Sequence, residues 1–180
     1  MIRTLASGLL FTALSAVPAA AQLSLGGSGD TQVAADDAVS ANGVTTLSGQ
    51  VDVRQGDVRI LANKMVIFSA NRGTAGSGPS VAGGIGDVER IVATGEFYYI
   101  TPEQEVRGDR GVYTAASDQF DVTGNVVLVQ DDSVVRGDRL IYDLSTERAR
   151  VLSECKGRRC GRARRVNILI KSNGQSASQS

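Results

Sequence analysis

The sequence predicts an all-β fold, an antiparallel sandwich, roll or open barrel that is built from repeated hairpins. Three observations lead to this prediction. A hairpin-sized segment occurs three times, its residues alternate between polar and apolar, and no window beyond the first residues keeps a helical period. At 180 residues, the chain is long enough for one domain with tails and a buried core.

The repeat is clearest around a doubled Arg-Gly-Asp-Arg. The segment "TGEFYYITPEQEVRGDRGVY" aligns without a gap on "TGNVVLVQDDSVVRGDRLIY", which lies 29 residues later. A third copy, "SGQVDVRQGDVRILANKMVI", precedes the last by 75 residues. In that copy Leu-Ala-Asn replaces the tripeptide, whereas the apolar spacing is kept. The repeat is therefore predicted to be architectural, and an adhesive role of the tripeptide loses its support.

Each copy is interpreted as two short strands joined by a polar turn. In the first strand Val51 and Val53 share one face, and Asp52 and Arg54 share the other. The second strand passes through a small residue, which is Ala62, Gly108 or Gly137 in the three copies. Such a residue is typical of a bulge or bend, where the face assignment can switch.

The rest of the chain is divided by composition. Further strands are predicted around residues 118–122, 147–152 and 165–170. Residues 70–87 hold six glycines and are expected to form a long flexible loop. Residues 22–40 and the last several residues are expected to be disordered. The β-roll itself is assigned to 41–153, followed by a basic, cysteine-containing tail at 154–180 with a possible last strand at 165–170.

The first 21 residues match a secretory signal peptide. Arg3 precedes an apolar run over residues 5–17, and Ala19-x-Ala21 is a small-residue cleavage site. The apolar run is too short to cross a bilayer. Export to an oxidising compartment is therefore expected.

The tail combines the two cysteines with a cluster of basic residues. Cys155 and Cys160 lie close enough to form one small disulfide loop, although two free thiols stay possible on spacing alone. Residues 156–171 hold seven basic residues and no acidic one, whereas residues 22–155 hold eleven basic and nineteen acidic residues, a net charge of −8. An anionic partner of the tail and a merely solvated tail explain this pattern equally well.

No catalytic, metal or cofactor site is predicted. The chain contains no histidine, so serine and cysteine nucleophiles lack their usual base and a metal site lacks a common ligand. The glycine-rich stretches have no strand–loop–helix context for phosphate binding. Nucleic-acid binding is disfavoured by the acidic body and the scarcity of aromatic residues. The sequence thus predicts that the protein is not an enzyme.

The apolar face of the repeated hairpins is the remaining candidate site. Such a face can be plain core, or it can hold an apolar ligand inside an open roll, whose edges can add strands from a partner. Asp52, Arg54, Lys64, Asn125 and Arg139 are expected on the opposite, solvated face. Alternation and repeat alignment predict that the following residues face the interior groove: Val51, Val53, Met65, Ile67, Phe97, Tyr99, Tyr113, Val126, Leu128, Leu140 and Tyr142.

Two consecutive repeats, "VERIVATGEFYYITPEQEVRGDRGVYTAASDQF" and "FDVTGNVVLVQDDSVVRGDRLIYDLSTERARV", resemble the OstA-like family over about residues 44–152. The shared phrase is Gly124-Asn125-Val126, a polar turn, the step Gly137-Asp138-Arg139 and then Asp143. The glycine-rich insertion and the Cys155–Cys160 tail are not part of that pattern.

The resemblance implies a twisted antiparallel β-jellyroll, open at both ends, that carries lipopolysaccharide across the periplasm with the lipid A acyl chains in the groove. It also implies head-to-tail self-association, an inner-membrane-anchored relay protein at the N-terminal edge and an outer-membrane translocon at the C-terminal edge. The alternative is an exported structural or adhesive β protein with a fully packed core and no lipid ligand.

Overall fold

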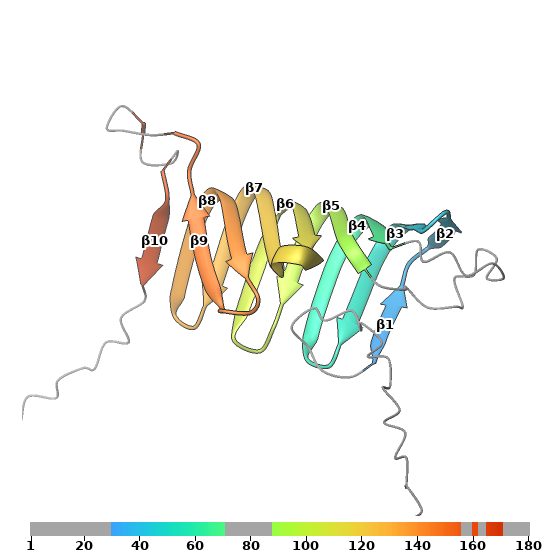
Figure 1. The fold of residues 1–180 in the computed structure, drawn as a ribbon. Helices are drawn as coiled ribbons and strands as arrows, with labels where there is room; N and C mark the ends of the chain where they lie inside the picture. Colours follow the sequence, from blue (N-terminus) through green and yellow to red (C-terminus); the bar gives the residue numbers. More distant parts are fainter. Residues whose placement is uncertain (1–29, 71–87, 156–159, 162–164, 171–180) are drawn as a thin grey trace, which may run out of the picture.

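The computed structural model describes residues 30–70, 88–155, 160–161 and 165–170, and the fold in these ranges is antiparallel β (Figure 1). The only helical element described is a 3-10 turn, η2 (Ala115–Ser117). The predicted signal peptide (1–21) and nearly all of the glycine-rich loop lie outside these residues. The strands are β1 (Thr31–Ala34), β2 (Asp37–Ala41), β3 (Val44–Gln55), β4 (Val58–Ser69), β5 (Val88–Ile100), β6 (Gln104–Thr114), β7 (Gln119–Gln130), β8 (Ser133–Asp143), β9 (Arg148–Leu152) and β10 (Asn167–Ile170).

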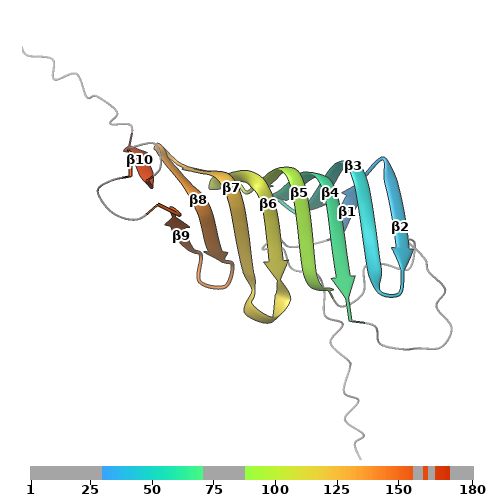
Figure 2. The same cartoon turned by 90° about the horizontal axis from the view of Figure 1, so that it is seen from above.

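The strands form one sheet whose neighbours are mostly consecutive hairpins. The order is β1-β3-β4-β5-β6-β7-β8-β10, with β2 added to β3 and β9 added to β8. The short strands β1 and β2 therefore lie at one end of the roll, and β9 and β10 lie at the other (Figures 1 and 2). The predicted all-β, hairpin-built fold is confirmed.

Each long strand bends in its middle, so the sheet folds over into two facing walls. The bends coincide with register shifts in every pairing from β3·β4 to β7·β8, and the line that they form along the sheet is called the crease. Wall 1 comprises β2, β9 and residues 44–48, 64–69, 88–94, 110–114, 119–123 and 139–143. Wall 2 comprises β1, β10 and residues 51–55, 58–61, 97–100, 104–107, 126–130 and 133–137.

Backbone conformation explains why the strands bend here without ending. Gly49, Gly95 and Gly124 have φ values of 76°, 76° and 79°, and the residue after each also has a positive φ. Two successive left-handed residues turn the strand sharply, and glycine tolerates this conformation because it lacks a β-carbon. The sequence predicted the bend in the second strand of each copy, at Ala62, Gly108 and Gly137. These residues do lie at the crease, but the left-handed pairs lie in the first strand, at glycines that the sequence analysis did not single out.

The bend in β7 also joins two segments that the sequence analysis treated as separate strands. Of the strand predicted at residues 118–122, residues 119–122 belong to the first half of β7, which continues through Gly124 to Gln130. The predicted strands at 147–152 and 165–170 correspond to β9 and β10. The expectation of disorder over residues 22–40 is wrong for β1 and β2, because the exposed edge of β3 supplies backbone partners to both.

The doubled Arg-Gly-Asp-Arg lies on the crease, where its aspartate reaches the next strand. Asp109 lies beside Gly124 and accepts a hydrogen bond from Asn125 Nδ2 at 3.0 Å. Asp138, in the second copy, accepts one from the backbone N–H of Glu154 at 2.8 Å. Asn63 takes the same place beside Gly95. The aspartate of the tripeptide therefore links its strand to the next segment of the chain at the crease, which agrees with the architectural interpretation of the repeat.

Candidate functional site

The interior between the two walls contains every residue that the sequence assigned to the groove. All eleven are at most 8 % exposed, and Phe97 and Leu140 are completely buried. They come from both walls and from all six long strands, so the apolar column runs along the roll. Their interior placement is established, whereas their contact with lipid stays a prediction.

Sequence reasoning missed a further set of interior residues. These lie mostly in the strand halves for which the repeat alignment assigned no face, on the other side of the bend. The alternating pattern Val58-x-Ile60 was a usable signal, but the switch of face at the crease obscured it. The missed buried residues are Leu47, Val58, Ile60, Ala62, Ile91, Ala93, Val106, Phe120 and Val122.

Aromatic rings bridge the two walls in the interior. The ring of Phe120 on wall 1 lies 5.0 Å from that of Tyr99 and 6.3 Å from that of Phe97, both on wall 2, between ring centroids. Tyr99 also lies 6.1 Å from Tyr142 on wall 1. Gly111 leaves the space that the Phe97 ring fills. Tilted ring contacts at these distances are favourable, so the rings hold the walls together.

The interior tyrosines are neutral groups. Burial is the main cause that raises the pKa of Tyr99, Tyr113 and Tyr142, and it brings that of Tyr113 to about 12. The Tyr113 hydroxyl donates a hydrogen bond to Asp118 Oδ1 at 3.1 Å. The interior thus combines apolar surface with a few neutral hydroxyls.

A cavity of about 390 Å³ opens where the walls meet opposite the crease. The turn at Thr101–Gln104 lines it from wall 2, and Leu144 lies beyond the end of wall 1. Tyr99 and Tyr142, from the aromatic cluster, form part of the same lining. This side opening, called the slit, connects the surface with the interior.

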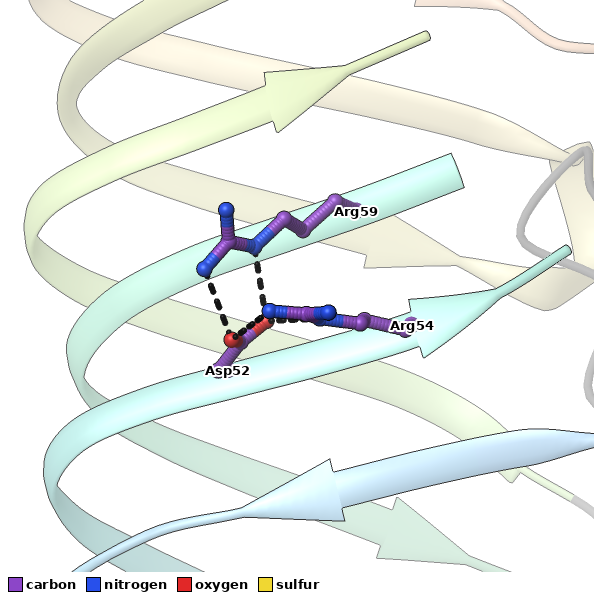
Figure 3. Close-up of polar contacts among 3 residues, drawn as sticks. All are labelled: Asp52, Arg54 and Arg59. Carbon is purple, nitrogen blue, oxygen red and sulfur yellow. Dashed lines mark hydrogen bonds and ion pairs between the residues drawn. The ribbon is translucent and has the colours of Figure 1, made fainter. Parts of the chain in front are cut away.

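The outer face is polar where the sequence predicted solvated residues. Arg54, Lys64, Asn125 and Arg139 are exposed. Figure 3 shows the Asp52 carboxylate between two guanidinium groups, with Arg59 Nη2 at 2.8 Å and Arg54 Nη2 at 3.0 Å from Oδ2. Hydrogen bonds from Arg59 first, then Arg54, lower the pKa of Asp52 to about 2.

The two ends of the roll expose apolar side chains. Val33 and Val39 on the N-terminal edge are 39 % and 57 % exposed, and Ile168, Leu169 and Ile170 on β10 are 60–72 % exposed. The sixth large exposed apolar residue among those described, Val166, adjoins β10. Edge strands with apolar side chains and unpaired backbone groups favour pairing with another sheet.

The two edges match in length and direction. β2 and β9 have five residues each on wall 1, and β1 and β10 have four each on wall 2. From the pairings, β9 runs toward the crease and β2 away from it, while β10 runs away and β1 toward it. A second copy stacked in the same orientation would therefore add two antiparallel pairs, β9 with β2 and β10 with β1.

A disulfide joins Cys155 to Cys160 in the connection between β9 and β10, with their Cα atoms 6.0 Å apart. No cluster of metal-ligating side chains occurs among the described residues. In the same part of the chain, no helix has the length and apolar character needed to cross a membrane.

Comparison with known proteins identifies the family. Residues 30–148 match the family model described as "LptA/(LptD N-terminal domain) LPS transport protein". The fold is similar to the crystal structure of LptH, the LptA homologous periplasmic component of the lipopolysaccharide transport device from Pseudomonas aeruginosa. The TM-score is 0.59 at 18 % identity, over 79 % of this chain and 96 % of that one. No curated protein matches the sequence. The resemblance to the OstA-like family is thereby confirmed: the chain belongs to the LptA/(LptD N-terminal domain) family of lipopolysaccharide transport proteins.

Proposed function

We propose that this chain is a periplasmic bridge protein, not an enzyme, that carries lipopolysaccharide from the inner to the outer membrane with the acyl chains between the two walls. The observation that carries the proposal is family membership combined with an apolar interior that reaches both ends of the roll. At the N-terminal end Val33 pairs with interior Val53, and at the C-terminal end Ile168 pairs with Val135, so the apolar column continues to the edges.

The interior offers the affinity that a carrier needs. Burial of one acyl methylene contributes roughly 0.8 kcal/mol, so one chain can be held without a charged contact. The slit gives lipid a lateral entrance beside Tyr99 and Tyr142. Because the interior side chains are nearly fully buried, an entering acyl chain takes the place of contacts between the walls, which part along the slit.

The edge strands at the two ends of the roll are where partner proteins would bind. Antiparallel strand addition at β1 and β2 would join the anchored relay protein, and addition at β9 and β10 would join the outer-membrane translocon. Copies of this chain would associate head to tail through the same two edges, which the matched lengths and directions support. Such stacking would make the apolar interior continuous from one subunit to the next.

Photocrosslinking from one interior and one outward residue tests the proposal. Leu128 faces the interior, whereas Ile141 on wall 1 lies between the interior residues Leu140 and Tyr142 and faces outward. A crosslinking residue at each position in turn, in lipopolysaccharide-producing cells, is expected to give a lipopolysaccharide adduct at 128 and none at 141. Adducts at neither position, with the protein folded and exported, would instead indicate a packed β-roll that binds no lipid.

A further inference from the structure

A second hollow lies on the outer face of wall 2 at the C-terminal end. It measures about 920 Å³ and is formed by residues 125–127 of β7, residues of β8 between 134 and 138, and β10 with the preceding Arg165. Val127, Val134 and Leu169 line it; Val134 and Leu169 are direct register partners. Val127 and Val134 alternate along their strands with the interior-facing Leu128 and Val135, so their side chains lie on the outer face. Val126 and Ile168, which belong to the apolar column of the interior, also line the hollow, so this hollow, called the outer groove, adjoins the C-terminal end of the interior.

The apolar floor of the outer groove departs from the usual pattern of a half-buried sheet, in which the outer face is polar. Val127 is only 9 % exposed although it points away from the interior. Leu169 is 60 % exposed and extends the apolar surface onto β10. Three apolar side chains in adjoining strands thus form a strip that a single acyl chain can cover.

Two arginine side chains lie next to the apolar residues of the outer groove. Arg136 and Arg165 line the groove and are exposed, and neither forms an ion pair with a described residue. Elsewhere on the outer face Arg59 and Arg139 are paired with aspartates. Asp138 also lines the groove, and its carboxylate accepts the hydrogen bond from the Glu154 N–H at 2.8 Å without forming an ion pair with either arginine among the described residues. The groove therefore presents two guanidinium groups against one carboxylate, a net positive charge.

We propose that the outer groove binds an amphiphile with a phosphate head and one acyl chain. The phosphate lies between Arg136 and Arg165, and the chain covers Val127, Val134 and Leu169. A terminal phosphate has three acceptor oxygens, enough for the paired N–H donors of two guanidinium groups, whereas a carboxylate has two oxygens. The three side chains under the acyl chain lie on the opposite face of the sheet from the interior, and the test below does not depend on the function proposed for the interior.

A tryptophan reporter makes the test specific to this groove, because the chain contains no tryptophan of its own. In the Leu169→Trp variant, the indole is expected to shift its emission to the blue on titration with 1-oleoyl lysophosphatidic acid. Lysophosphatidylcholine with the same chain, whose phosphate is masked by choline, is expected to bind at least tenfold more weakly. Inorganic phosphate alone is expected to give no shift and to compete poorly.

Substitution of the two arginines supplies the second readout. In the reporter background, Arg136→Gln with Arg165→Gln is expected to raise the Kd for lysophosphatidic acid at least tenfold. The matched control, Arg148→Gln with Arg150→Gln, changes two arginines of β9 that do not line the groove and is expected to leave the Kd unchanged. Equal Kd values for the two lipids, an unchanged Kd in the Arg136/Arg165 variant, or full competition by inorganic phosphate would overturn the proposal.

Discussion

The carboxylate of Asp109 occupies the space beside Gly124 that a β-carbon would need, and this contact joins β6 to β7 at the crease. Asn125, the next residue of β7, donates a hydrogen bond to the same carboxylate at 3.0 Å. One short sequence element therefore couples a bend in one strand to a bend in its neighbour. Similar joints occur at Asn63 with Gly95 and at Asp138 with the Glu154 N–H, which gives the roll a repeated joint along its length.

A double-mutant cycle at this joint should reveal coupling. Gly124→Ala is expected to lower the free energy of unfolding by about 2 kcal/mol or more, because φ of 79° costs alanine about 1–2 kcal/mol and its β-carbon meets the Asp109 carboxylate. In an Asp109→Ala background the same substitution should cost less, since only the backbone penalty remains. Urea unfolding measures each variant, with Glu105→Ala on β6 as a surface control. Strictly additive effects would argue against the joint.

The packing of Gly111 against Phe97 predicts a strong effect of one methyl group. A β-carbon at position 111 would lie 2.5 Å from Phe97 Cε2, and the Phe97 ring is completely buried, so it cannot move aside. Gly111→Ala is therefore expected to destabilise the protein by about 1–3 kcal/mol. Gly161→Ala is the matched control, because nothing lies within 4 Å of that site. Equal thermal midpoints for the two variants would contradict this account of the wall-to-wall contact.

The Asp52 ion pairs predict a pH-dependent contribution to stability. The folded pKa of Asp52 is about 2, below the ordinary value of 3.8, so its stabilisation is present above pH 3.8 and is lost as the pH falls through about 2. Because Arg54 and Arg59 are 55 % and 42 % exposed, solvent screening limits this contribution to about 1 kcal/mol. Asp52→Asn should therefore destabilise the protein at pH 6 and much less at pH 2.5. A difference in unfolding free energy that stays constant between these pH values would refute the linkage.

The Cys155–Cys160 disulfide is expected to secure β10. Among the described strands, β10 pairs with β8 alone, through four residues, and its three apolar side chains are 60–72 % exposed, so little burial holds it in place. Cys155→Ser with Cys160→Ser should speed amide hydrogen exchange in β10 and leave β4 to β7 unchanged. Reducing agent should reproduce the effect in the unaltered chain and have none in the variant. Unchanged exchange in β10 would mean that strand pairing alone retains it.

The N-terminal edge predicts an effect on association. Val39 on β2 is 57 % exposed, and a charge on an edge strand opposes strand addition. Val39→Lys is expected to shift the concentration at which copies associate upward by at least tenfold, as measured by sedimentation. Thr94→Lys, on wall 1 within the sheet, is the matched control. Equal association of both variants would exclude β2 from the interface.

Local pattern was enough to predict the hairpins and the side on which many residues lie. Strand alternation has a period of two, so one apolar residue indicates the face of its neighbours, and all eleven residues assigned in this way are inside. The small residue in the second strand of each copy likewise indicated the crease, whereas the left-handed glycines of the first strands, Gly49, Gly95 and Gly124, were not predicted as bend positions. Residues such as Ile60 and Val106 were missed because the bend switches the face within a strand.

By itself, therefore, the sequence determined the all-β class, the hairpin order and the family. Only the tertiary structure decided which wall faces which, that Phe97 packs on Gly111, that β1 and β2 are ordered on the edge of β3, and that the outer face of wall 2 carries an apolar groove. The physical reason is the separation along the sequence between the residues that interact. Alternation and turn chemistry act between near neighbours and can be read along the chain, whereas contacts across the roll depend on the summed bends of six strands.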